Sequence, residues 1–160
     1  MKKTLVLVVA AFALVGCGNG AGSKTTTTVC SIDKPIGLFS SVKQTIISEG
    51  DVAKKIEYEE IYEGSSKEEV DATLPQVEEV MKSTNSLEGV TATYERVNDT
   101  SIKNMVEYDL EKVSIQTLAR VGLIPMAVDL DGPTDEDVRS VSVEQTVKSL
   151  EVQGFTCSVE

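Results

Sequence analysis

Apolar and polar residues alternate at a period of two along several short segments of the chain. Such alternation is typical of β-strands that bury one face and expose the other. The chain also has two β-prone runs near the ends of its folded part. The alternating segments are 42–48 (VKQTIIS), 52–62 (VAKKIEYEEIY), 90–95 (VTATYE) and 102–110 (IKNMVEYDL), and the two β-prone runs are 25–32 (TTTTVCSI) and 155–159 (FTCSV). The pattern therefore predicts a mainly antiparallel sheet.

The segments 42–48 and 52–62 are separated by Glu49-Gly50-Asp51. A short glycine-containing turn between two alternating segments predicts a β-hairpin. In the second segment the apolar residues change parity after Tyr58, from even positions to Ile61. This change predicts a bulge or a strand end near Glu59 and Glu60.

Helical periodicity follows in residues 66–83, where apolar side chains recur at intervals of three and four. The stripe consists of Val70, Leu74, Val77 and Met81. Ser66 with Glu69 forms a capping-box pattern at its start. Pro75 lies inside the stripe without breaking its phase, which predicts one kinked helix or two abutting helices.

Two further short helices are predicted, at 114–121 and 142–153, and Thr134 is a candidate N-cap between them. Ser142 with Gln145 caps the second, and Gly154 ends it. The predicted fold class is α+β: an antiparallel sheet of about five strands with helices packed on one face, a two-layer sandwich.

The N-terminus carries a targeting signal. Met1-Lys2-Lys3 is basic and 4–13 is an apolar run that is too short to span a bilayer, which needs roughly 20 residues. The next residues, 14–17 (LVGC), place a branched apolar residue at −3, a small residue at −1 and Cys17 at +1. This pattern resembles the lipobox of bacterial lipoproteins, in which a diacylglycerol is attached to the cysteine sulfur. The alternative is an ordinary cleaved signal in which Cys17 is incidental.

The predicted organisation is a lipoprotein signal peptide at 1–16, a lipidated Cys17 with a flexible tether at 17–24, and one domain at 25–160. Removing residues 1–16 takes away two lysines and no acid, so 13 basic and 26 acidic residues remain and the net charge becomes −13. A chain this acidic is repelled by nucleic acid and by anionic lipid. We therefore expect the lipid, and no charge attraction, to attach the protein to its membrane, and we expect no nucleic-acid partner.

Cys30 and Cys157 remain, one near each end of the domain, and both lie in β-prone runs. Export favours oxidation, so we predict that adjacent strands bring them together in a disulfide. Closing so long a loop stabilises a fold by roughly 4–5 kcal/mol in the chain-entropy model. Two separate buried thiols are the alternative. Redox catalysis is disfavoured because the chain has no Cys-x-x-Cys pair.

The chain has no histidine. It therefore lacks the usual general base, triad member and zinc ligand, so we expect no enzymatic activity and no cofactor. Weak candidates for a cation site are Glu57 and Glu59, in an acidic run with Glu60 and Glu63, and Asp129 and Asp131. The acidic run is explained more simply as a solvated face. The second stretch fails the EF-hand spacing at Gly132-Pro133 and is explained more simply as acids in the first turn of a helix.

The order of these features resembles the YehR family of small bacterial lipoproteins, whose soluble part is a domain of unknown function. The resemblance rests on Cys17 and its lipobox, Glu49-Gly50-Asp51, Leu74-Pro75 through 87–90 (LEGV), 108–113 (YDLEKV) leading to Leu118, and 147–150 (VKSL) with Gly154-Phe155. It implies the fold and the lipid anchor, and it implies no catalytic residues. Cys30 and Cys157 depart from the usual pattern of the family, so their pairing is predicted from this sequence.

The sequence thus predicts a membrane-anchored bacterial envelope lipoprotein, a non-catalytic module that binds an envelope protein or small ligand or supports envelope assembly. The alternative is a surface lipoprotein that binds a cation or small solute through acidic residues. Gly18 follows the lipidated cysteine, where an aspartate typically retains lipoproteins at the inner membrane of a two-membrane bacterium. We expect the domain to lie outside the cytoplasm, at the cell membrane or the outer membrane.

Overall fold

A mainly antiparallel sheet dominates the computed structural model, which describes residues 24–114, 117–118 and 141–160. Its strands are β1 (Thr25–Ile32), β2 (Phe39–Glu49), β3 (Val52–Glu63), β4 (Val90–Asn98), β5 (Ser101–Asp109), β6 (Val141–Ser142) and β7 (Thr156–Val159). The helices with described bounds are α1 (Lys67–Thr84) and α3 (Val143–Val152). The fold class is α+β, as predicted, and the sheet has seven strands where about five were expected.

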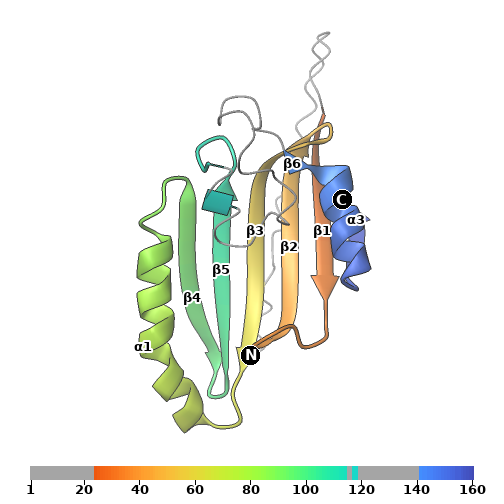
Figure 1. The fold of residues 1–160 in the computed structure, drawn as a ribbon. Coiled ribbons are helices and arrows are strands. Elements are labelled where there is room, and N and C mark those ends of the chain that lie inside the picture. The colour runs from red at the N-terminus through yellow and green to blue at the C-terminus, as the bar shows by residue number, and fades with distance from the viewer. Residues whose placement is uncertain (1–23, 115–116, 119–140) are drawn as a thin grey trace, which may run out of the picture.

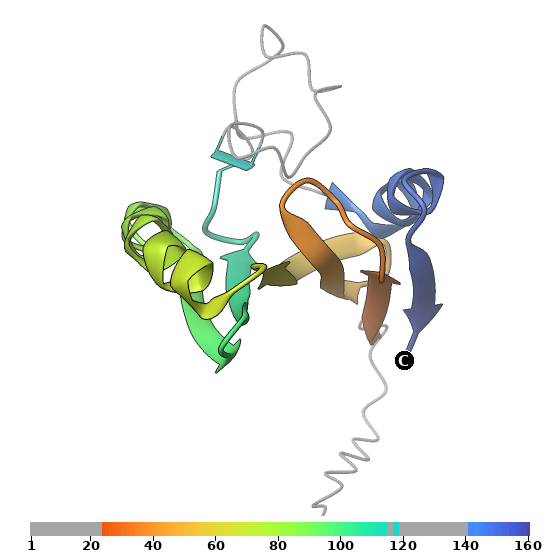
Figure 2. The ribbon, with the colours of Figure 1, turned by 90° about the horizontal axis from the view of Figure 1, so that it is seen from below.

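The strand order across the sheet is β4-β5-β3-β2-β1-β7, and the two-residue β6 pairs with the start of β3. The hairpins β2–β3 and β4–β5 are joined through the pairing of β3 with β5 (Figure 1). β7 pairs with β1, so the first and last strands of the domain are neighbours. Viewed from below in Figure 2, α1 and α3 stand at opposite ends of the sheet.

Side chains alternate between two faces of this sheet. One face, which we call the buried face, contains Cys30, Val42, Gln44, Ile46, Ile56, Tyr58, Glu60, Ile102, Asn104 and Tyr108. The other, the polar face, contains Lys43, Thr45, Ile47, Glu57, Glu59, Lys103 and Glu107. The largest hydrophobic cluster joins Ile46 and Ile56 of the sheet to Leu150 of α3 and to Phe155. Sheet and helix are therefore held together by burial of apolar area.

β3 has neither the bulge nor the strand end that was predicted near Glu59 and Glu60, so this prediction is wrong. β3 pairs with β5 without interruption from Lys55 to Glu63, and the register shifts of β2–β3 lie at Phe39/Ser41 and Ile47/Ser48. Because the alternation continues past Tyr58, Glu60 stays on the buried face and Ile61 lies on the polar face. The apparent change of parity comes from a charged residue at an inward position.

Helix α1 begins at the predicted N-cap Ser66, and the return bond of Glu69 goes to the amide of Ser65 in place of Ser66. The Ser66 hydroxyl accepts a hydrogen bond from the Glu69 amide at 3.2 Å. The Glu69 carboxylate accepts from the Ser65 amide at 2.8 Å and from the Tyr62 hydroxyl at 3.1 Å, which ties the helix start to β3. The helix continues through Pro75 as one element, so the alternative of two abutting helices is wrong.

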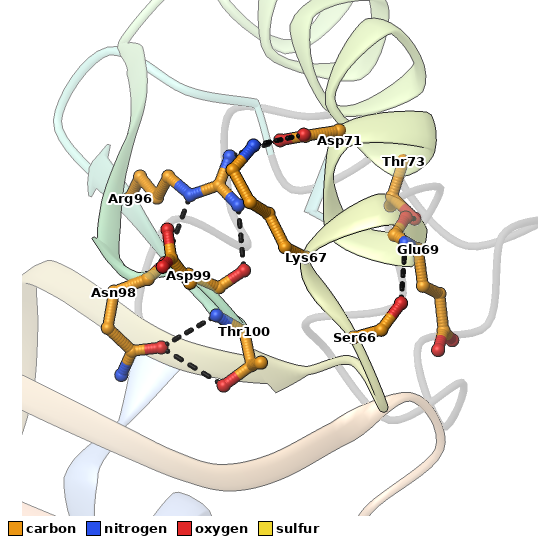
Figure 3. Close-up of polar contacts among 9 residues, drawn as sticks. All are labelled: Ser66, Lys67, Glu69, Asp71, Thr73, Arg96, Asn98, Asp99 and Thr100. Atoms are coloured by element: carbon orange, nitrogen blue, oxygen red, sulfur yellow. Dashed lines mark hydrogen bonds and ion pairs between the residues drawn. The ribbon is translucent and has the colours of Figure 1, made fainter.

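An arginine ties α1 to the β4–β5 turn (Figure 3). The guanidinium of Arg96 pairs with Asp71 of α1, and it also donates to the backbone oxygens of Asn98 at 3.0 Å and Asp99 at 2.7 Å. The Asn98 side chain accepts in turn from the Thr100 amide at 2.8 Å, which closes the turn. One planar group thus bonds both the helix and the turn.

At the other end of the sheet, α3 begins as predicted. The Ser142 hydroxyl accepts from the Gln145 amide at 3.2 Å. The carboxylate of Asp51, in the β2–β3 turn, accepts from the Ser142 hydroxyl at 2.7 Å and from the Glu144 amide at 2.8 Å. These hydrogen bonds lower the pKa of Asp51, the bond from Ser142 most strongly. The turn therefore acts as a second cap on the helix.

Several predicted features lie outside the described residues. These are the signal peptide at 1–16, Cys17, the candidate N-cap Thr134 and most of the helix predicted at 114–121. In the part of the chain that the structure describes, no helix has the length and apolar character needed to cross a membrane.

We predict that Gly89→Ala destabilises the fold far more than Gly37→Ala. Both glycines have positive φ, +74° and +59°, so alanine at either position costs about 1 kcal/mol of backbone strain. A Cβ at position 89 would lie 2.7 Å from the Val113 amide nitrogen and 2.8 Å from the Lys112 Cβ, whereas at position 37 no described atom lies within 4 Å. Overpacking adds roughly 1–3 kcal/mol to the cost at position 89. Urea unfolding measures both, and equal losses would contradict the close approach at Gly89.

Candidate functional site

The two cysteines predicted to pair are neighbours. Cys30 of β1 lies directly opposite Cys157 of β7, with Cα atoms 4.0 Å apart and sulfur atoms at a disulfide distance of 2.07 Å. The Glu160 amide donates to the Thr27 oxygen at 2.9 Å, which makes the cysteine pair a non-hydrogen-bonded one, the kind in which opposite side chains lie closest. Cys30 is fully buried in the main hydrophobic cluster. The predicted meeting of the two terminal strands at these cysteines is confirmed.

The acidic residues proposed for a cation site lie on the polar face. Glu59 is paired with Lys43 of β2. Glu57 lies opposite Glu107 of β5, whose carboxylate is 3.0 Å from the Lys55 ammonium. Hydrogen bonding to Glu107 raises the pKa of Lys55. No group of three or more His, Cys, Asp or Glu among the described residues is placed to hold a metal ion, and Asp129 and Asp131 lie outside those residues.

A different set of polar side chains lies in the middle of the buried face. It consists of Gln44 on β2, Tyr58 and Glu60 on β3, and Asn104 on β5, and we call it the polar centre. Glu60 is directly opposite Asn104, and it is a diagonal neighbour of Gln44, which is opposite Tyr58. Direct and diagonal neighbours on one face of a sheet are within reach of each other's side chains. Three adjacent strands thus contribute to one polar group.

The two amides of the polar centre are deeply buried. Gln44 is 2% exposed and Asn104 is 8% exposed. Neither Gln44 Oε1 nor Asn104 Oδ1 has a hydrogen-bond partner among the described residues. An unsatisfied buried acceptor typically costs about 1–3 kcal/mol, and most such groups in native proteins have a partner. The polar centre therefore contains two buried acceptor oxygens that each lack a hydrogen-bond donor in the described part of the chain.

Glu60 lies on β3, between the strands that carry these two amides. Burial raises its pKa, and a hydrogen bond from Asn104 partly offsets the rise. No lysine or arginine of the described residues forms an ion pair with it. A half-buried carboxylate without a neighbouring cation is costly to ionise. Such a perturbed acid on the buried face is a candidate for function.

Two aromatic rings stand beside the carboxyl group. Tyr58 and Tyr108 pack edge to face, with ring centroids 6.0 Å apart. Burial is the main cause that raises the pKa of Tyr58, and it raises the pKa of Tyr108 to about 12. Both phenols are therefore neutral at physiological pH. The site combines one acid, two amide acceptors and aromatic rings, a set suited to binding a donor group.

We predict that Glu60→Gln raises the melting temperature at pH 7. The pKa of Glu60 is higher in the folded state than the 4.5 of the free side chain, so the folded state resists its ionisation. This penalty is absent below pH 4.5, grows as the pH rises from 4.5 to the folded-state pKa, and is fully present above that pKa. Thermal melts at pH 4 and pH 7 measure it, with Glu57→Gln on the polar face as the control. A variant that is less stable than wild type at pH 7 would contradict the prediction.

In the sequence, Glu60 is one of several glutamates in the acidic run 57–63 and was not predicted as a site residue. The sequence pattern that indicates its inward position is the unbroken alternation Tyr58-x-Glu60-x-Tyr62. This alternation places Glu60 on the same face of the sheet as the two tyrosines. Gln44 is found in the same way, between Val42 and Ile46. A polar residue at an inward position of a strand is thus the pattern to search for.

Comparisons with known proteins bear on the fold. No protein-family model matches the chain, and no curated protein matches it. The NMR structure of a protein from Streptococcus pneumoniae TIGR4 is similar over 99% of this chain and 99% of that chain, with a TM-score of 0.57 and 14% identity. The NMR structure of the Escherichia coli YehR protein is similar over 84% of this chain and 91% of that chain, with a TM-score of 0.61 and 18% identity. At these identities the likeness concerns the fold, and the chain has a YehR-like fold.

Proposed function

We propose that this chain is a bacterial envelope lipoprotein, anchored outside the cytoplasm through a lipid on Cys17, whose domain is a non-catalytic binding module. The basic start, the apolar run and the LVGC sequence at 14–17 support the anchor. The tether predicted at 17–24 ends where β1 begins, at Thr25, and a glycine-rich linker of that length would span roughly 15 Å. The domain is thus held close to the membrane surface.

The single observation that carries the binding role is the pair of buried acceptor oxygens on Gln44 and Asn104. A sheet that served only as a scaffold would gain stability from apolar residues at these inward positions. Retaining two amides and an acid there is costly, and a bound donor group would offset that cost. We therefore place the binding function on the buried face rather than at Glu57 and Glu59.

We infer that both helices cover the buried face and leave the polar centre between them. Leu150 of α3 packs in the cluster that contains Cys30 and Ile46. At the other end of the sheet, Glu78 of α1 accepts from the Tyr94 hydroxyl at 2.8 Å, and Tyr94 lies opposite Asn104. Each helix therefore contacts side chains of the buried face, from opposite ends of the sheet.

The second candidate function, binding of a small solute, is favoured over binding of a metal cation. Glu59 already has a partner in Lys43, and Glu57 and Glu107 bring two carboxylates together without a third acidic group among the described residues. Ca²⁺ typically takes six to eight oxygen ligands. The polar centre offers the better-defined chemistry, and a small solute or a side chain of a partner protein could occupy it.

Membrane fractionation of wild type and Cys17→Ala tests the anchor. We expect wild type in the membrane fraction, with an N-terminal diacylglyceryl cysteine in its mass spectrum, and Cys17→Ala in the soluble fraction or uncleaved. Ser23→Ala, a change in the tether, is the matched control and stays with the membrane. An unmodified thiol on Cys17, or a mature N-terminus elsewhere, would refute the lipoprotein assignment.

A further inference from the structure

We propose that the polar centre binds the primary ammonium group of a small ligand or of a lysine-like side chain. This inference rests on the proposed binding function and adds the chemical class of the ligand. Its basis is the juxtaposition of the Glu60 carboxyl group with the unpartnered oxygens of Gln44 and Asn104 on three adjacent strands.

The polar centre has as many acceptor groups as an ammonium group has N–H donors, and one of these acceptors can carry the opposite charge. An ammonium group carries three N–H donors and no acceptor, and an ionised carboxylate accepts only. Glu60, Gln44 and Asn104 each supply an oxygen. A ligand hydroxyl supplies one donor and no charge, so it would leave Glu60 unneutralised. An ammonium group would satisfy the amides and balance the carboxylate through charge-assisted hydrogen bonds.

The aromatic rings strengthen the preference for a cation. Tyr58 lies on β3 two residues before Glu60, and its ring packs edge to face against Tyr108 at 6.0 Å between centroids. A cation within about 6 Å of a tyrosine ring gains roughly 0.5–2 kcal/mol from the ring quadrupole, more as water is excluded. Neutral tyrosine rings beside a carboxylate are therefore suited to contact an organic cation.

The side chains of the polar centre differ in their solvent exposure. Gln44 and Asn104 are more than nine-tenths buried, whereas Glu60 and Tyr58 are only half-buried. A charged head group would thus meet Glu60 first and the two amides below it. A metal ion is less suited, because the site has one carboxylate and no group of three metal-binding residues was found in the described part of the chain.

The test is an NMR titration of the full-length mature chain with n-butylammonium chloride as the probe and n-butanol as its neutral counterpart. We expect saturable shifts of the Gln44 and Asn104 side-chain amide resonances with butylammonium, and none with equal concentrations of butanol or potassium chloride. Glu60→Gln should weaken binding by about tenfold or more, because the charge partner is lost. Glu57→Gln, on the polar face, should bind like wild type.

Loss of binding in Glu60→Gln cannot be ascribed to unfolding if its melting temperature matches or exceeds that of wild type. Equal shifts with butanol, undiminished binding by Glu60→Gln, or displacement of butylammonium by millimolar Ca²⁺ would overturn the ammonium assignment. So would the absence of any shift with butylammonium. None of these results affects the Cys17 fractionation, so failure of this inference is distinguishable from failure of the lipoprotein assignment.

Discussion

Replacing Cys30 and Cys157 together with alanine is expected to lower the free energy of unfolding by about 4–5 kcal/mol. The two residues are 127 positions apart, so their bond closes a loop that contains nearly the whole domain. In the chain-entropy model, a cross-link over so long a loop removes much of the freedom of the unfolded chain. A loss of this size is a large share of the stability of an ordinary domain.

The structure makes the terminal strand the most sensitive element. β7 has four residues, pairs with β1 and lies at an edge of the sheet (Figure 2, the blue arrow that ends at C). Without the covalent link, few backbone hydrogen bonds hold it, so it should open before the rest of the sheet. Hydrogen exchange of the double variant should therefore show faster exchange at 156–159 than in β2 and β3.

The cysteines of this chain supply their own controls. Chemical denaturation of wild type with and without dithiothreitol should reproduce the loss, and the double variant should not respond to the reductant. Cys17→Ala, which leaves both domain cysteines in place, should unfold like wild type when both are compared in detergent. Equal stability of oxidised and reduced wild type would favour the alternative of two separate buried thiols.

Alternation and capping made most of the elements predictable from the sequence. β4 was expected to bury Val90 and Ala92, and it does. Ser66 and Ser142 were expected to cap their helices, and each hydroxyl accepts the amide three residues on. These features depend on neighbours within a few residues, so local chemistry determines them. The two-residue β6 has too few residues to show a period.

The candidate site as a whole could not be predicted, because alternation along β3 can place Glu60 inward but only strand pairing brings Gln44 and Asn104 next to it. Glu57, Glu59 and Glu60 look alike in the sequence, yet the first two lie on the polar face and the third on the buried face. The hydrophobic pattern predicted that Glu60 faces outward, which would need a bulge near Glu60, whereas the irregularity within β3 lies at its start, between Ala53 and Lys55. The pairing of β3 with β5, which brings Asn104 opposite Glu60, joins segments more than 40 residues apart. No local signal fixes that register.

The pair Ile46 and Ile47 offers a direct test of this two-faced sheet. Ile46→Ala is expected to cost roughly 3–5 kcal/mol, because a fully buried isoleucine loses both transfer free energy and packing, and it leaves a cavity. Ile46 is 0% exposed in the main cluster and faces Ile56 across the strand pair. Urea unfolding should show a lower midpoint with an unchanged slope.

Ile47→Ala is the matched control, because the residue type, the strand and the size of the truncation are the same. Ile47 is half-buried on the polar face, opposite Lys55, so its loss should cost about 1 kcal/mol. The difference between the two variants measures how much more apolar burial one face provides than the other. Similar losses would place both isoleucines in comparable environments, and the inward position of Glu60, which follows from the same register, would then be wrong as well.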